Sequence, residues 1–173
     1  MTDWKALRDQ VYQTAVNHGW HETKREFPEI ACLIHSELSE ALEELRKPNN
    51  PDYYTGENGK PEGFWVEMAD CVIRILDWMG DEKQEPKLLN MHDVKAMAES
   101  DRVATIAVSH ISVSRALETY LKGDISGAAF WLNVTITMVE SQFEAEGQSL
   151  EDMIVFKDAY NAKKRAWKHG RLF

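Results

Sequence analysis

Four carboxylates arranged as two spaced pairs are the residues of this sequence best suited to chemistry. Glu37 and Glu40 form one pair, Glu67 and Asp70 form the other, and the members of each pair are three positions apart. Residues three apart on a helix lie on one face, so two packed helices would bring all four together. Converging carboxylates repel one another unless a cation lies among them, and an all-oxygen ligand set favours Mg²⁺ or Mn²⁺. The pattern predicts a metal-dependent enzyme that acts on a phosphorylated substrate.

Metal-assisted hydrolysis is the reaction that such a site predicts. A bound Mg²⁺ would neutralise phosphate charge, orient the substrate and lower the pKa of a bound water. A carboxylate not needed for metal binding would act as the general base. Other chemistries lack their motifs: helical di-iron sites use Glu-x-x-His, and the sequence contains neither a GxxxxGK[ST] phosphate loop nor a GxSxG nucleophile elbow.

The sequence predicts different environments for the two pairs. Glu37 and Glu40 lie on the shoulder of an apolar stripe, where a solvated acidic face is the competing interpretation. Around Glu67 and Asp70, apolar side chains cover most of the helix circumference, which is typical of a central, buried helix. A charge on a buried helix is costly unless it is paired or bound to a metal. The solvated interpretation is therefore weaker for the second pair.

Hydrophobic periodicity predicts the helices that position these carboxylates. Apolar residues at spacings of three and four predict a first helix over 2–18, a second over 28–47 and a third over 62–79. Segment 48–61 is rich in proline and glycine and predicts a loop that lets the second and third helices pack antiparallel. The predicted fold class is all-α, a helical bundle formed by a single domain that spans residues 1–173.

The middle of the chain, about 81–148, predicts further helices without recognisable chemistry. A short helix over 87–100 precedes two longer ones over 101–122 and 125–146, which pair naturally as a hairpin. His110 falls on an apolar helix face, where a core histidine is a simpler interpretation than a metal ligand. We expect this region to serve as core or as a dimer surface.

A basic stripe follows on the last helix, which the sequence predicts from Glu151 to about Lys168. Four cations and one amide recur there at helical spacing: Lys157, Asn161, Lys164, Arg165 and Lys168. Cations near a helix C-terminus complement the helix dipole, which is the structural interpretation. The stripe has more cations than a cap requires, so we expect it to hold phosphate groups that face the metal.

Composition restricts the class of protein. The 173 residues carry a net charge of −9, which argues against non-specific nucleic-acid binding. The N-terminus lacks the apolar core of a signal peptide, and the longest mostly apolar run, 128–139, is too short to cross a bilayer. Cys32 and Cys71 lie in apolar helical patterns without a CxxC spacing, which predicts two buried free thiols. We expect a soluble, cytoplasmic protein.

The carboxylate motifs and their surroundings resemble a known family. Glu37-x-x-Glu40 followed by Glu67-x-x-Asp70 is similar to the ExxE…ExxD signature of the MazG-like, all-α nucleoside triphosphate pyrophosphohydrolases, a superfamily that includes the dimeric dUTPases. The adjoining residues agree, with LIHSELSEALE at 33–43 and EMADCVIR at 67–74. The Gly19-Trp20 loop and the ending KDAYNAKKR at 157–165 also resemble members, so the similarity covers about 4–79 and 151–173.

The resemblance implies an activity, a cofactor and a set of site residues. Members hydrolyse a nucleoside triphosphate between the α and β phosphates to a monophosphate and pyrophosphate, in house-cleaning or control of nucleotide pools. The resemblance implies a helical homodimer or higher homo-oligomer in which Mg²⁺ is held by Glu37, Glu40, Glu67 and Asp70. The residues that it implies for phosphate and sugar binding are Lys157, Asn161, Lys164 and Arg165. It also implies, more weakly, that Trp20 stacks on the base.

The alternative to an enzyme is a non-enzymatic helical module that binds a metal, a nucleotide or a partner. Acidic helix faces are common without catalysis, and the helical insertion at about 81–148 departs from the compact members of the family. The two hypotheses differ in their response to Mg²⁺. A metal that binds only the folded form raises the melting temperature, which the enzyme hypothesis requires.

Overall fold

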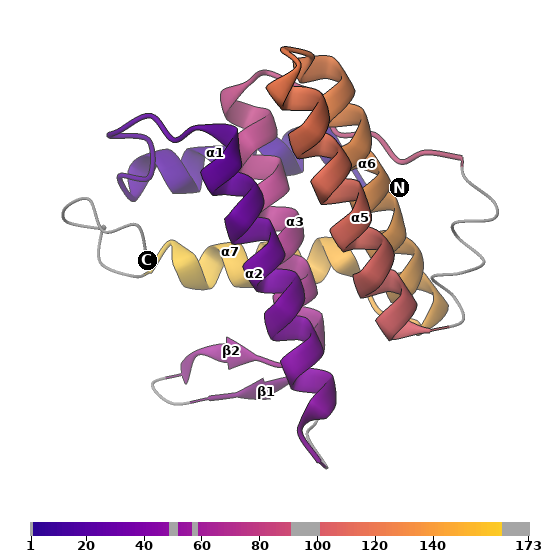
Figure 1. The fold of residues 1–173 in the computed structure, drawn as a ribbon. Helices are drawn as coiled ribbons and strands as arrows, with labels where there is room; N and C mark the ends of the chain where they lie inside the picture. Colours follow the sequence, from indigo (N-terminus) through magenta and orange to yellow (C-terminus); the bar gives the residue numbers. More distant parts are fainter. Residues whose placement is uncertain (1, 49–51, 57–58, 91–100, 164–173) are drawn as a thin grey trace.

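Six helices and one short hairpin make up the secondary structure of the described residues, 2–48, 52–56, 59–90 and 101–163, in the computed structural model (Figure 1). The helices are α1 (Trp4–Asn17), α2 (Phe27–Arg46), α3 (Phe64–Asp81), α5 (Arg102–Leu121), α6 (Ile125–Ala145) and α7 (Leu150–Asn161). Strands β1 (Tyr54–Thr55) and β2 (Pro61–Glu62) pair antiparallel. The predicted all-α class is confirmed. Within the described part of the chain, no helix has both the length and the apolar character needed to cross a membrane.

Local sequence chemistry sets where the helices begin. Four of them have a side-chain cap, in which an oxygen accepts a backbone N–H of the first turn: Asp3 in α1, Asp101 in α5, Asp124 in α6 and Ser149 in α7. Helix α2 instead carries a proline in its first turn, where the missing N–H would have no partner anyway. The predicted helices lie within two residues of the observed boundaries for α1, α2, α3, α5 and α6.

Helix α3 is the centre of the molecule. It runs antiparallel to α2, α7 crosses it, and it also contacts α1 and α6 (Figure 1). Its apolar side chains are buried nearly all round, as the sequence predicts. One continuous core contains residues from all six described helices, so the middle region packs onto the same core as the rest. The carboxylates of α3 therefore lie on a helix that neighbours hold on several sides.

Helices α5 and α6 form the expected hairpin and bury small neutral polar groups between them. Ser112 Oγ and Thr135 Oγ1 are 2.7 Å apart across the pair. Thr137 and Ser141 donate to carbonyl oxygens one turn back in α6. The hairpin packs against α2, where His110 Nδ1 lies 2.7 Å from His35 Nδ1. His110 thus links two helices and is not among the residues that line the candidate site described below.

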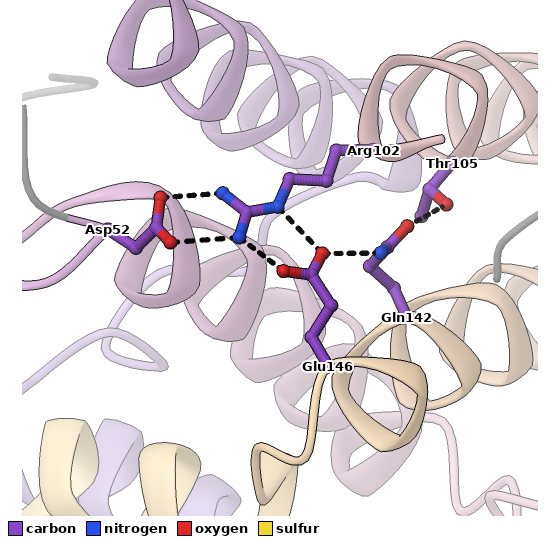
Figure 2. A network of polar contacts seen from close by, with 5 residues as sticks. All are labelled: Asp52, Arg102, Thr105, Gln142 and Glu146. Carbon is purple, nitrogen blue, oxygen red and sulfur yellow. Dashed lines mark hydrogen bonds and ion pairs between the residues drawn. The ribbon is translucent and has the colours of Figure 1, made fainter. Parts of the chain in front are cut away.

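Arg102 ties the α5–α6 hairpin to the start of α3 (Figure 2). Its guanidinium donates to both carboxylate oxygens of Asp52, at 2.6 and 2.8 Å, and to Glu146. It also lies 4.7 Å and 4.8 Å from the ring centres of Phe64 and Trp65. The Asp52 carbonyl in turn accepts the Trp65 N–H at 3.3 Å. One side chain therefore connects the hairpin helices, the chain before β1 and the N-terminus of the helix that carries Glu67.

Residue Gly63 permits this close approach. It has φ +116°, and a Cβ there would lie 2.5 Å from the Asp52 carbonyl oxygen. Both the positive φ and the contact exclude a larger side chain. The sequence predicts only a loop over 48–61, but its described residues include β1 and the first residue of β2, and the Gly56 N–H donates to the Lys60 carbonyl at 2.7 Å.

Three further predictions are wrong over the described residues. Residues 87–90 are not helical, because the Lys87 and Leu89 N–H groups donate to Asn133 Oδ1 and Thr137 Oγ1 of α6; residues 91–100 lie outside the description. Helix α7 ends at Asn161, with a turn at 162–163 where the prediction continues the helix; the rest of the predicted helix, to Lys168, lies outside the described residues. Cys71 is fully buried and Cys32 is exposed, because Cys32 faces away from the core that its neighbours enter.

Candidate metal and phosphate site

A cavity of about 340 Å³ lies among α1, α2, α3 and α7. Six carboxylates and three cations line it: Glu37, Glu40, Glu67, Asp70, Asp77, Asp158, Lys60, Arg74 and Lys157. The lining also includes His18, Trp20, Asn161 and several apolar residues of α1 and α2. Among the described residues, those of α5 and α6 contribute nothing to the lining. The pocket therefore combines the acidic motifs with the start of the basic stripe.

Three of the four predicted metal ligands converge in this cavity. One oxygen each of Glu37, Glu67 and Asp70 lies within 4.8 Å of the other two. Oxygens bound to one Mg²⁺ are separated by roughly 3–4 Å, since Mg–O distances are about 2.1 Å. Small side-chain movements would bring these three oxygens to one cation, and their packed helices hold them close to that arrangement.

Glu40, the fourth predicted ligand, lines the pocket but lies outside this group of three. It is exposed, and its Oε1 accepts a hydrogen bond from Ser36 Oγ at 3.2 Å. Three residues along a helix correspond to a rotation about 60° short of a full turn. On α2 this offset takes Glu40 from the buried side to the surface. On α3 the same offset leaves Asp70 in the site, because neighbouring helices surround α3 more completely.

Two of the three converging carboxylates already have a cationic partner. Arg74 Nε donates to Glu37 Oε1 at 3.0 Å, and Lys157 Nζ lies 2.5 Å from Asp70 Oδ2. Lys157 is only 3% exposed, so its ammonium is held out of water. These pairs come from different helices: Arg74 is on α3, and Lys157 is on α7.

The Glu67 side chain is different, because no described residue forms a hydrogen bond or ion pair with it, although it is 3% exposed and lines the cavity. Burial raises the pKa of Glu67 to about 8, and the nearby Asp70 carboxylate adds to this effect. Burial also raises the pKa of Glu37, against the opposing influence of Arg74. Raised carboxyl pKa values in a cavity are typical of functional sites.

The residues fit a hard divalent cation. All donors are carboxylate oxygens, which suit Mg²⁺ or Mn²⁺ rather than a softer metal. With no hydrogen bond or ion pair to a described residue, the buried Glu67 carboxyl keeps its proton near neutral pH, and a divalent cation would favour its ionised form by replacing that proton. Glu37, Glu67 and Asp70 would hold the ion directly, and Glu40 lies at the same cavity wall.

The predicted phosphate-binding residues divide into two groups. Lys157 and Asn161 of α7 line the cavity, one helical turn apart. Lys164 and Arg165 lie outside the described residues. The Asp158 carboxylate, which follows Lys157, accepts hydrogen bonds from Gln10 at 2.9 Å and Thr14 at 3.0 Å. These contacts fasten this part of α7 to α1.

Trp20, the residue that the resemblance implies for base stacking, lines the cavity with two guanidinium groups against its ring. Arg25 lies 4.3 Å and Arg74 4.7 Å from a ring centre. Arg74 thereby contacts both Trp20 and Glu37. A base that stacks on Trp20 would share the ring with these cations, so the stacking role stays a prediction.

Sequence reasoning missed Lys60 and the pairing of His21. Lys60 lies in the turn before β2 and lines the cavity; burial alone would lower its pKa, but Glu67, Glu62 and other carboxylates raise it overall. A single lysine between Gly59 and Pro61 has no periodicity that would reveal it. His21 Nε2 lies 2.8 Å from Asp77 Oδ1, and this hydrogen bond raises the His21 pKa although burial opposes it.

Comparison with known proteins adds no assignment. A scan against protein-family models, a search of curated proteins and a search of solved structures each found no match.

Proposed function

We propose that this chain is a Mg²⁺-dependent nucleoside triphosphate pyrophosphohydrolase of the MazG-like type, which cleaves a ribo- or deoxyribonucleoside triphosphate between the α and β phosphates. The observation that carries the proposal is Glu67. This carboxylate is 3% exposed, lines a cavity and has no hydrogen bond or ion pair to any described residue. Two further carboxylates lie within 4.8 Å of it. A divalent cation would supply the positive charge that the ionised form of Glu67 needs in this buried position.

The charge balance of the cavity supports a metal–nucleotide complex as the ligand. Six carboxylates face three cations across the cavity wall. A free triphosphate would be repelled by this excess of negative charge. Bound divalent metal would neutralise phosphate charge and make a bound water more acidic. An anionic substrate can therefore bind this acidic pocket only together with a divalent metal.

The chain's own residues have separate tasks in the proposed reaction. Glu37, Glu67 and Asp70 hold the cation, while Lys157, Lys60 and Asn161 bind phosphate oxygens. Glu40 is exposed at the cavity and belongs to no ion pair in the described structure, so its free oxygen is available to accept a proton from the attacking water. The water oxygen bonds to the α phosphorus, the bond from the α phosphorus to the bridging oxygen breaks, and pyrophosphate leaves with that oxygen.

Pyrophosphate release from a panel of ribo- and deoxyribonucleoside triphosphates tests the proposal directly. We expect release from one or a few substrates with Mg²⁺, none with EDTA, and none beyond background from Glu67→Gln. Nucleotide identity and products are read by chromatography, which separates monophosphate from diphosphate. Release of orthophosphate and a diphosphate would contradict cleavage between the α and β positions.

One observation favours the alternative, a non-enzymatic binding module. Arg74 and Lys157 already compensate Glu37 and Asp70 without any metal. Thermal melting with and without Mg²⁺, combined with the release assay, separates the two functions. An enzyme shows both a metal-dependent increase in melting temperature and turnover; a metal-binding module shows the increase alone, and a module that binds only a protein partner shows neither.

The proposal includes assembly into a homodimer or higher homo-oligomer, as the resemblance implies. Light scattering coupled to size-exclusion chromatography measures the mass of the assembly against the 19.9 kDa chain. We expect a mass of at least twice the chain.

A further inference from the structure

The Lys157 ammonium lies where an added cation would have to go. Its Nζ is 2.5 Å from Asp70 Oδ2, and Asp70 is one of the three carboxylates that converge in the cavity. The side chain is 3% exposed, so water does not take up the role of partner. A metal that binds Asp70 therefore competes with a cation supplied by the protein itself.

The backbone at Lys157 cannot easily carry the ammonium away. The next residue, Asp158, is buried and accepts hydrogen bonds from Gln10 and Thr14 of α1. Helix α7 also packs against α3. Displacement of the ammonium must therefore come from rotation of the four-carbon lysine side chain, which is flexible enough to present Nζ at different points of the cavity.

An ammonium that leaves Asp70 needs another anion. A buried cation without a partner is strongly unfavourable. The carboxylates nearest to Lys157 are those that the metal would bind, so they do not provide the replacement. A phosphate oxygen does, and Asn161 one turn along α7 and Lys60 on the facing turn add donors to the same cavity.

We infer that Lys157 exchanges Asp70 for a phosphate oxygen when the metal binds, so that metal and phosphate bind this cavity with positive coupling. The inference rests on the proposed function in taking phosphate as the second ligand. Without phosphate, the Lys157–Asp70 pair keeps the metal affinity low. With phosphate, the ammonium has a new partner and Asp70 is released to the metal. Because coupling is reciprocal, metal also strengthens phosphate binding.

Titration of the protein with Mn²⁺, followed by the electron paramagnetic resonance signal of free Mn²⁺, measures this coupling without turnover. Wild type, Lys157→Met and Lys60→Met are compared with and without inorganic phosphate at constant ionic strength. Protein-free titrations supply the correction for Mn²⁺ bound by phosphate itself. Lys60→Met is the matched control, because it removes one positive charge from the same cavity without removing the Asp70 partner.

We expect Lys157→Met to bind Mn²⁺ about tenfold more tightly than wild type in the absence of phosphate, a usual size for coupling between sites. Lys60→Met should change the affinity by no more than about threefold, as expected for an electrostatic effect without a direct contact. Phosphate should tighten Mn²⁺ binding to wild type, and this increase should be much smaller in Lys157→Met.

Two results would overturn the coupling while leaving the metal site in place: equal Mn²⁺ affinity in wild type and Lys157→Met, or an undiminished phosphate effect in the variant. A different result would overturn the metal site of the proposed function. In that case Mn²⁺ would bind neither to wild type, even with phosphate, nor to Lys157→Met. Circular dichroism establishes that each variant is folded. The wild-type phosphate effect needs no variant, and its absence alone contradicts the inference.

Discussion

The two parts of the molecule bury polar groups in opposite ways. In the α5–α6 hairpin the buried polar side chains are neutral: Ser112 and Thr135 pair with each other, others donate to helix carbonyls, and Ser109 Oγ is buried without a hydrogen-bond partner among the described residues. Around the cavity formed by α1, α2, α3 and α7 they are mostly charged, and they include Glu37, Glu67 and Lys157. Both parts belong to one core.

This difference distinguishes polar groups that help helices pack from polar groups that are suited to bind a ligand. A buried hydroxyl that donates to its own helix satisfies itself and lets two helices approach closely. A buried carboxylate without a partner lowers stability, so its presence needs another reason. We interpret the hairpin as the scaffold and the charged cavity as the place where stability has been given up for binding.

The largest expected effect is that of Glu67→Gln, which should lower pyrophosphate release by about a thousandfold and raise stability. Loss of several kcal/mol of transition-state stabilisation by the metal corresponds to that factor. The raised pKa of Glu67, about 8 against an ordinary 4.5, means that ionisation opposes folding increasingly as pH rises between those values. The free energy of unfolding in EDTA should therefore exceed that of wild type by on the order of 4 kcal/mol at pH 8.

Guanidinium denaturation at pH 5 and pH 8 measures the second part of this prediction, because the advantage of the variant should fall below about 1 kcal/mol at pH 5. A Glu67→Gln protein less stable than wild type at pH 8 would show that the carboxylate has a stabilising partner. The cavity would then not differ from the α5–α6 hairpin by burying a carboxylate that lowers stability.

Arg102→Ala tests the connection between the regions and should lower the free energy of unfolding by about 2 kcal/mol at pH 7. Its hydrogen bonds lower the pKa values of Asp52 and Glu146. Carboxyls with lowered pKa stabilise the folded state above their ordinary pKa, and this contribution is lost as pH falls through the lowered value. The difference from wild type, measured by urea denaturation, should therefore shrink at pH 3. A difference independent of pH would assign the effect to contact with Phe64 and Trp65 instead.

Ser112→Ala addresses the scaffold and should cost about 1 kcal/mol of stability without changing pyrophosphate release. The loss arises because Thr135 Oγ1 remains buried without the hydroxyl that lies 2.7 Å away. The double variant with Thr135→Val should recover most of it, since removal of both polar groups leaves neither unsatisfied. A drop in turnover at unchanged stability would place the hairpin in the function.

His21→Gln should have the smallest effect, below about 1 kcal/mol at pH 6. The hydrogen bond to Asp77 raises the His21 pKa, so the protonated histidine stabilises the folded state below its ordinary pKa. This contribution is lost as pH rises through the raised value. Denaturation at pH 6 and pH 9 should show the difference only at pH 6, whereas the Ser112→Ala difference should be the same at both.

The helices were predictable because each has an apolar pattern of several turns. The β1–β2 hairpin was not predictable, since strands of two residues are too short for any periodicity. These strands are held by the closing hydrogen bond between Gly56 and Lys60. Residues 87–90 escape prediction for a different reason. Their backbone donors bond to side chains of α6, which local sequence does not reveal.

The candidate site was predictable as far as it depends on spacing within a helix. Spacing places Glu67 and Asp70 on one face of α3, and the buried character of α3 follows from its composition. The exposure of Glu40 and the pairing of Lys157 with Asp70 depend on how α2 and α7 pack against α3, which is tertiary information. The contribution of Lys60 to the cavity lining depends on the β1–β2 hairpin, which was not predicted.

The two cysteines allow alkylation kinetics to report how often the helices beside the cavity separate. Cys71 follows Asp70 on α3, is fully buried, and has its thiol pKa raised by burial and by the nearby Glu37 and Asp70 carboxylates; Cys32 on α2 is exposed. An alkylating reagent would therefore modify Cys32 at once and Cys71 only during transient separation of the packed helices. The rate of the slow phase measures how often the helices packed around Cys71 separate. A ligand that draws the carboxylates together would lengthen that phase and leave the fast one unchanged.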